Sequence, residues 1–218
     1  MQIVDLSHEI RTGMQVYPGD PDVRITTALN VDEHGVNVLS IHLGSQSGTH
    51  VDSPFHVLKG LATLDQLELS KFVGRACIVD ATGLSPRSEI PHELFLATNY
   101  TGCSIVLVRT DWSDYFGTPE YLAHPFPSMS SLALLRDVGV TTIALDFLSL
   151  DCTPENPSES TLENHYLWSR ANGIIAENLR NLRSITAATP YVSLLPINLG
   201  ASDGAWIRAV ALSDFTND

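Results

Sequence analysis

A short polar segment in the first third of the chain is its most informative stretch. Residues 45–56 read Ser-Gln-Ser-Gly-Thr-His-Val-Asp-Ser-Pro-Phe-His, and four potential ligands stand at even positions: Gln46, His50, Asp52 and His56. On an extended chain, side chains two residues apart point to the same side, so His50 and Asp52 can face one point. A glycine and a proline can bend the chain so that the outer two join them. Imidazoles and a carboxylate that converge suit zinc, manganese or iron.

A second pair of potential ligands, His165 and Glu177, lies far along the chain. Their separation of 12 residues leaves a rotation of roughly 120° on a single helix, so they cannot share one helix face. The Asn172-Gly173 pair between them allows His165 to come from a helix and Glu177 from the next element. Glu177 follows an apolar run and is expected to be partly buried, and a buried carboxylate needs a charge partner, which a metal would supply.

Hydrophobic patterning predicts more strands than helices. β-Branched and alternating stretches predict strands at residues 36–43, 76–80, 104–109, 142–146 and 206–212. A helix is expected from Ser130, its cap, to Val138 before Gly139, and another over residues 161–171 with Thr161 as its cap. The order helix, glycine, strand in residues 130–150 is a common way to return a crossover helix to a sheet. We therefore expect an α/β or α+β fold with a mixed sheet or open barrel, and residues 1–218 as a single domain.

The charge balance limits the kinds of molecule that the protein is expected to bind. The 218 residues include 12 basic and 25 acidic ones, a formal charge of −13. Phosphate binding needs clustered Lys and Arg, so we expect no nucleic-acid partner and no anionic membrane surface. No apolar run approaches the roughly 18 residues that span a bilayer. The N-terminus lacks a basic segment followed by an apolar core, so a cytoplasmic location is expected.

Residues 48–56, G-T-H-x-D-x-P-x-H, resemble the signature of the bacterial kynurenine formamidase and cyclase family, which includes isatin hydrolase. The similarity extends to an early P-G-D turn at Tyr17–Asp20, to His165 and Glu177 in their spacing, and to a C-terminal strand around Arg208–Val210. The resemblance implies a swivelling β/β/α fold, a small-molecule substrate, and a homodimer or higher homo-oligomer.

The resemblance also implies a ligand set. In two-metal members, one ion is bound by the first histidine of H-x-G-T-H, the second histidine and the aspartate. The other ion is bound by the same aspartate, the last histidine of the signature, and the later histidine and glutamate. Carried over, the first site would contain His50 and Asp52, and the second Asp52, His56, His165 and Glu177.

The chain departs from that pattern at Gln46, which stands where those members have the first histidine. An amide oxygen is a poorer zinc ligand than an imidazole. We therefore expect one tightly bound zinc or manganese ion at the second site, and a weak or absent ion at the first, where Gln46 is a weak ligand at best. A second departure is Trp206, where a proline is expected, and this change is expected to alter the pocket.

The ligand set favours hydrolysis by metal-activated water, with His50 and His56 as candidate catalytic residues. The reaction would cleave a C–N or C–O bond of a small amide, formamide, lactam or lactone. Tyr17 and Asp20 would bind the substrate, although a Pro18-Gly19 turn explains their positions equally well. The alternative, which Gln46 favours, is a non-hydrolytic cyclase or dehydratase-like enzyme, or a ligand-binding protein on the same fold.

Overall fold

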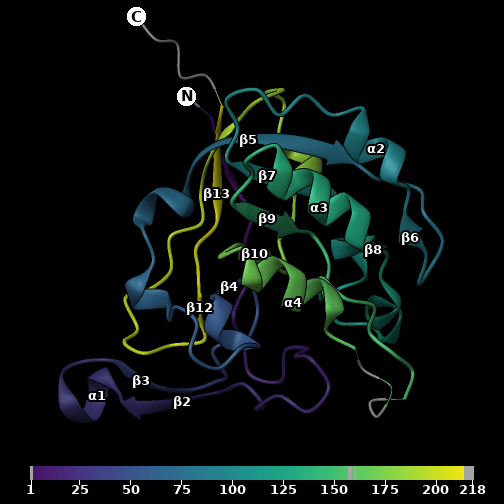
Figure 1. Cartoon of the computed structure of the whole chain (residues 1–218). Coiled ribbons are helices and arrows are strands. Elements are labelled where there is room, and N and C mark those ends of the chain that lie inside the picture. Colours follow the sequence, from purple (N-terminus) through teal and green to yellow (C-terminus); the bar gives the residue numbers. More distant parts are fainter. Residues whose placement is uncertain (1, 157–158, 160, 214–218) are drawn as a thin grey trace, which may run out of the picture.

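The computed structural model describes residues 2–156, 159 and 161–213. Within them, one mixed sheet of nine strands forms the body of the protein (Figure 1). In spatial order its strands are β1 (Gln2–Asp5), β13 (Val210–Ser213), β11 (Tyr191–Ser193), β5 (Val73–Asp80), β7 (Ile105–Arg109), β9 (Thr142–Leu145), β10 (Ile174–Glu177), β4 (His50–Asp52) and β12 (Gly204–Trp206).

The centre of this sheet is parallel and is buried on both faces. Strands β5, β7, β9 and β10 run parallel, and β4 then pairs antiparallel with β10. On β7, Val106 and Val108 face a core beneath the helices, whereas Ile105 and Leu107 face a second core inside the curl of the sheet. A strand covered on both sides must be apolar at every position, which explains the uninterrupted run Ile-Val-Leu-Val in residues 105–108.

Three helices cover one face of the sheet: α2 (His92–Leu96), α3 (Met129–Asp137) and α4 (Glu163–Arg170) (Figure 1). Helix α3 joins β7 to the parallel strand β9, as the helix–glycine–strand order predicts. Helix α4 is followed by Asn172 in a left-handed conformation (φ 57°) and by Gly173. A Cβ on Gly173 would collide with the indole of Trp168, so only glycine fits at this entry into β10. His165 and Glu177 therefore come from successive elements.

The remaining elements are short. A hairpin of β2 (Arg24–Leu29) and β3 (Val38–His42), tipped by α1 (Val31–His34), projects from the body (Figure 1), and β6 (Glu89–Ile90) pairs with β8 (Phe126–Pro127). Single 3-10 turns occur at Pro54–His56, Leu64–Gln66, Leu69–Lys71, Trp112–Tyr115, Pro119–Ala123 and Leu182–Ser184. Among the described residues, no helix is long and apolar enough to cross a membrane.

The expected mixed sheet with flanking helices is confirmed, and four of the five predicted strands appear as β3, β5, β7 and β9. The single strand predicted at residues 206–212 is wrong. The chain leaves β12, which pairs with β4, and crosses to β13, which pairs with β1 and β11, so residues 207–209 form the link.

Both predicted helix caps also differ. Ser128, not Ser130, caps α3 by accepting a hydrogen bond from the Ser131 amide, and Leu162, not Thr161, precedes α4.

Candidate metal centre and active site

The candidate site lies where β10 ends beside β4. Glu177, the last residue of β10, stands directly opposite His50 of β4 in the antiparallel register. Because alternate residues of a strand share a face, His50 and Asp52 point to the same side, toward α4. His165 approaches this point from α4, so three elements converge on it. The site thus sits at the carboxyl ends of the parallel strands, where open α/β sheets commonly bind ligands.

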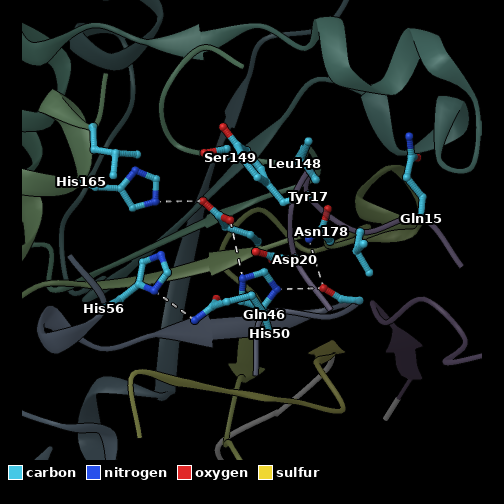
Figure 2. A pocket seen from close by; sticks show the side chains of 14 residues that line it. Gln15, Tyr17, Asp20, Gln46, His50, His56, Leu148, Ser149, His165 and Asn178 are labelled. Carbon is cyan, nitrogen blue, oxygen red and sulfur yellow. Dashed lines mark hydrogen bonds and ion pairs between the residues drawn. The ribbon is translucent and has the colours of Figure 1, made fainter. Parts of the chain in front are cut away.

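The two buried carboxylates lie between two buried histidines. Nε2 of His50 is 3.5 Å from Oδ1 of Asp52 and 3.6 Å from Oε2 of Glu177. Nε2 of His165 is 3.4 Å from Oε1 of Glu177 and 3.9 Å from Oδ2 of Asp52. All four residues are at most 5% exposed. Figure 2 shows the imidazoles of His50, His56 and His165 on the wall of the pocket beside these carboxylates.

Two groups of potential ligands result, and Asp52 belongs to both. One contains Asp52, His56 and His165, and the other His50, Asp52 and Glu177; within each group the ligand atoms lie within 4.8 Å of one another. Glu177 therefore stands between His50 and His165 and is not confined to the second of the expected sites.

The electrostatics of this cluster favour a cation. Burial opposes charge on His50, but the carboxylates of Asp52 and Glu177 outweigh it and raise the pKa of His50 to about 9. Burial likewise opposes charge on His165, but Asp151 and Glu177 raise the pKa of His165 to about 10. Within the described part of the chain, the buried Oδ1 of Asp52 accepts no hydrogen bond, which is uncommon for a buried carboxylate oxygen. A divalent ion fits this donor set, because it would supply the positive charge that the imidazoles otherwise gain by binding protons.

A hydrogen-bond acceptor faces Nδ1 of each of the three histidines of the site. Nδ1 of His50 lies 2.9 Å from the carbonyl oxygen of Gly48, and Nδ1 of His165 lies 2.6 Å from Oδ2 of Asp151. Nδ1 of His56 lies 3.4 Å from Oδ2 of Asp203. An imidazole that donates from Nδ1 keeps the lone pair of Nε2 free, which is the form that binds a metal.

Asp151 has a second role, at the start of α4. Its oxygens accept hydrogen bonds from the backbone amides of Asn164 (2.9 Å) and His165 (3.0 Å). This carboxylate therefore caps the helix and orients the histidine that the helix carries, which explains why no side chain adjacent in sequence caps α4.

Gln46 is close to the site but turned toward its edge. Its Nε2 donates to Oδ2 of Asp203 at 2.9 Å and lies 3.2 Å from Nδ1 of His56. Its Oε1 is buried and has no hydrogen-bond partner among the residues that the structure describes. Gly204 provides the space, since a Cβ there would lie 2.5 Å from Nε2 of Gln46 and 3.3 Å from Oδ1 of Asp52. Hydrogen bonds from His56 and Gln46 hold the pKa of Asp203 well below its usual range.

A cavity of about 210 Å³ opens above these residues (Figure 2). Tyr17 and Asp20 line it, and so do Gln15, Leu148, Ser149, Leu162 and Asn178. The Asp20 amide donates to the Tyr17 carbonyl at 3.0 Å and Gly19 has φ 104°, as a type II turn requires. The turn therefore places both side chains on the cavity wall, and burial raises the pKa of Asp20.

The structure thus brings together all the residues singled out from the sequence: Gln46, His50, Asp52, His56, His165 and Glu177 at the centre, with Tyr17 and Asp20 beside them. Trp206 does not line the cavity, because its indole N–H donates to the carbonyl oxygen of Gly44 at 2.6 Å. Sequence reasoning missed Asp151 and Asp203 as partners of the histidines. An aspartate beside a glycine, as at Asp203-Gly204, indicates no more than a turn.

His124 is fully buried but lies outside the cavity lining. Its Nδ1 lies 2.8 Å from the carbonyl oxygen of Pro125, its Nε2 lies 2.9 Å from Oγ1 of Thr153, and its ring stacks on Phe147. Burial lowers the pKa of His124 to about 4. This histidine is therefore a neutral structural residue.

We predict that His124 makes the protein less stable in acid. The pKa of a histidine in the unfolded chain is about 6.5, so between pH of about 6.5 and 4 the unfolded state binds a proton that the folded state does not. The free energy of unfolding should fall across this range, by up to about 3 kcal/mol from this residue. Urea unfolding at several pH values should show that the free energy of unfolding falls less with decreasing pH in His124→Gln than in the wild type. Parallel curves would contradict the assignment.

Comparisons with known proteins show the family and the fold to which this chain is similar. The family model Cyclase, described as "Putative cyclase", matches residues 4–152. The kynurenine formamidase of Salinibacter ruber is 30% identical over 216 residues, which cover 96% of this chain and 97% of that protein.

Two solved structures share the fold. An isatin hydrolase bound to the product analogue thioisatinate superposes with a TM-score of 0.84 at 21% identity, covering 96% of this chain and 91% of that one. A potential metal-dependent hydrolase with cyclase activity gives a TM-score of 0.76 at 22% identity and covers 96% of each chain. The family model matches more than half of this chain, and a relative that is 30% identical aligns over nearly all of it. This chain therefore belongs to the Cyclase family.

Proposed function

We propose that this protein hydrolyses an aryl formamide or a small aryl lactam, using one tightly bound zinc or manganese ion held by Asp52, His56, His165 and Glu177. Metal-dependent amide hydrolysis is the class of reaction that the family relatives and the ligand cluster together indicate. The substrate, the metal and the number of ions are the parts that we add. The observation that carries the proposal is the pair of buried carboxylates, Asp52 and Glu177, beside three histidines that line the cavity.

The substrate class follows from the cavity walls and the relatives. Tyr17, Leu148 and Leu162 offer apolar surface to an aromatic ring, whereas Asp20 and Ser149 offer polar groups to an amide. The relatives are named for kynurenine formamidase and isatin hydrolase activities, which concern a formamide and a cyclic amide. An aromatic ring that carries an amide group is common to both activities, and it would contact both the apolar and the polar residues of the cavity wall.

The chain's own residues would then handle binding and protons. When bound, a divalent ion supplies Lewis acidity, which polarises the carbonyl and makes a water molecule acidic. Tyr17 and Asp20 bind the substrate. His50 receives the proton of the attacking water and returns it to the leaving nitrogen, provided that its Nε2 is not occupied by a second ion. His56, the other candidate catalytic residue, would hold the tight ion through its Nε2, so we assign proton transfer to His50.

A second ion would bind weakly. Its ligands would be His50 and Asp52, with Glu177 beside them and the unpaired Oε1 of Gln46 as an oxygen donor. An amide oxygen binds zinc less well than the imidazole it replaces, so we propose that this position fills only at high metal concentration, or not at all.

The metal content of the purified protein tests this proposal. Elemental analysis should find about one ion per chain in the wild type and none in His165→Ala, because Nε2 of His165 faces both carboxylates. Turnover of N-formylkynurenine or isatin should stop with a chelator and return with zinc or manganese. His92→Ala, which changes a histidine outside the cavity, should retain both the metal and the activity.

Other results would redirect the proposal. About two ions per chain would mean that Gln46 or water completes the first position. A metal-free wild type without turnover would contradict hydrolysis and favour the ligand-binding alternative on this fold.

We also propose that the protein is a homodimer or a larger homo-oligomer. An isolated two-stranded hairpin is marginally stable in water, yet β2 and β3 pair only with each other in the described part of the chain. Ile25 pairs with Ile41 in this hairpin, and Leu39 and Ile41 are each 58% exposed on the same face. A permanently exposed apolar face needs a partner that is always present, and a second copy of the chain meets that need.

A charge on this face should dissociate the oligomer. We predict that Leu39→Lys sediments as a monomer at concentrations where the wild type is dimeric or larger. Ser40→Lys, on the opposite face of the same strand, should sediment like the wild type. A monomeric wild type, or equal effects of the two variants, would contradict an interface through this face.

A further inference from the structure

We infer that Gln46 acts as a positioning residue: it holds Asp203, and Asp203 orients His56. The inference rests on the proposed function, because His56 is one of the proposed metal ligands. It gives the residue at position 46 a role other than that of a substitute ligand.

Side chains hold Asp203 in place. Oγ of Ser45 lies 2.9 Å from its Oδ1 and 3.1 Å from its Oδ2, and Nε2 of Gln46 donates to Oδ2 at 2.9 Å. Nδ1 of His56 faces the same Oδ2 at 3.4 Å. Two successive residues thus bind a carboxylate that follows 157 positions later in the chain. Without these donors, a half-buried carboxylate would be free to turn toward solvent.

The carboxylate determines which nitrogen of His56 carries hydrogen. An ionised carboxylate only accepts hydrogen bonds, so a bare Nδ1 beside it would be repelled, whereas an Nδ1–H would donate. Donation to a carboxylate is also stronger than acceptance from a neutral amide. His56 therefore keeps its hydrogen on Nδ1, and Nε2 is left with a lone pair. Figure 2 shows the Nδ1 edge of His56 turned toward Gln46 and the other edge of the ring toward His165.

On the opposite side of the site, another aspartate also faces Nδ1 of a histidine, but different groups hold that aspartate in place. Asp151 faces Nδ1 of His165 and is fixed by the backbone amides of Asn164 and His165. Among the described contacts of the Asp203 carboxylate, the donors other than His56 are the side chains of Ser45 and Gln46, while Ser53 donates to the Asp203 carbonyl oxygen. Asp203 therefore depends on the identity of residue 46, whereas Asp151 depends on the fold of α4.

Glutamate at position 46 separates a positioning role from a ligand role. A glutamate carboxylate binds zinc better than an amide oxygen, but it cannot donate to Asp203 and places a second negative charge beside it. If Gln46 positions Asp203, Gln46→Glu should weaken Zn²⁺ binding at the tight site. If Gln46 is chiefly a ligand, the same variant should bind Zn²⁺ as tightly as the wild type or more tightly.

The experiment measures the dissociation constant of Zn²⁺ by competition with a chromophoric chelator. We expect Asp203→Asn to weaken binding about 10- to 100-fold, the usual cost of removing a residue that orients a metal ligand. Asp5→Asn is the matched control: its carboxylate also accepts a strong pair of hydrogen bonds, from Arg208, but lies outside the site. Its Zn²⁺ affinity should equal that of the wild type.

The double variant Gln46→Glu/Asp203→Asn exchanges the amide and the carboxylate. The new carboxylate at position 46 would lie near Nδ1 of His56, since Nε2 of Gln46 is 3.2 Å from that atom. The new amide at position 203 would donate a hydrogen bond to this carboxylate. We expect the double variant to bind Zn²⁺ more tightly than either single variant, which a merely structural role would not produce. Losses that simply add would overturn the inference.

A spectroscopic readout completes the test. Long-range ¹H–¹⁵N spectra of the zinc-loaded protein should show the hydrogen of His56 on Nδ1 in the wild type and a changed Nδ1 signal in Asp203→Asn. Thermal unfolding identifies any variant that fails to fold. A wild type that binds neither Zn²⁺ nor Mn²⁺ would refute the proposed function. A wild type that binds Zn²⁺, with Asp203→Asn unchanged and Gln46→Glu tighter, would refute only the role given to Gln46.

Discussion

The burial of two carboxylates at one point, away from water, is the constraint on which the rest of the site depends. Asp52 and Glu177 lie on neighbouring strands and are almost entirely enclosed. Two buried negative charges are costly unless a positive charge compensates them. In the protein alone, protons on His50 and His165 meet part of that need, as their raised pKa values indicate. A divalent cation would supply the positive charge instead and would leave both imidazoles neutral, with their Nε2 lone pairs free to bind it.

Strands, a helix and a loop each position part of the site. The parallel strands end at one edge of the sheet, and the antiparallel pairing of β4 with β10 sets His50 opposite Glu177. Helix α4 brings His165 to the same edge, and Asp151 fixes both the start of that helix and the direction of the imidazole. The loop before β12 brings Asp203 to His56. Each histidine therefore has its Nδ1 beside an acceptor that comes from another part of the chain or from the local backbone.

Much of this site could be predicted from the sequence, because its densest part is local. The segment from Gln46 to His56 carries four of the converging residues within 11 positions, and the alternation of His50 and Asp52 is a property of any extended chain. The Asn172-Gly173 break correctly indicated that His165 and Glu177 come from different elements. Three of the four parallel strands, β5, β7 and β9, were also predicted, whereas β10 was identified only as an apolar run.

The missed features depend on contacts that are distant in sequence. Asp203 meets Gln46 across 157 positions and Asp151 caps α4 from 13 positions away, and neither aspartate has a local pattern that distinguishes it from a turn residue. The single strand expected at residues 206–212 failed for a related reason. Its apolar pattern is continuous, but its two halves pair with different strands, and only the assembled sheet determines that division.

The most direct test of the central claim is anomalous X-ray diffraction, recorded at the absorption edge of zinc or manganese, from crystals of the protein purified without chelators. The account predicts one strong anomalous peak among Asp52, His56, His165 and Glu177, with at most a weaker peak beside His50 and Gln46. A peak confined to surface histidines, or no peak from protein supplied with metal, would contradict the claim that the buried carboxylates hold a catalytic ion.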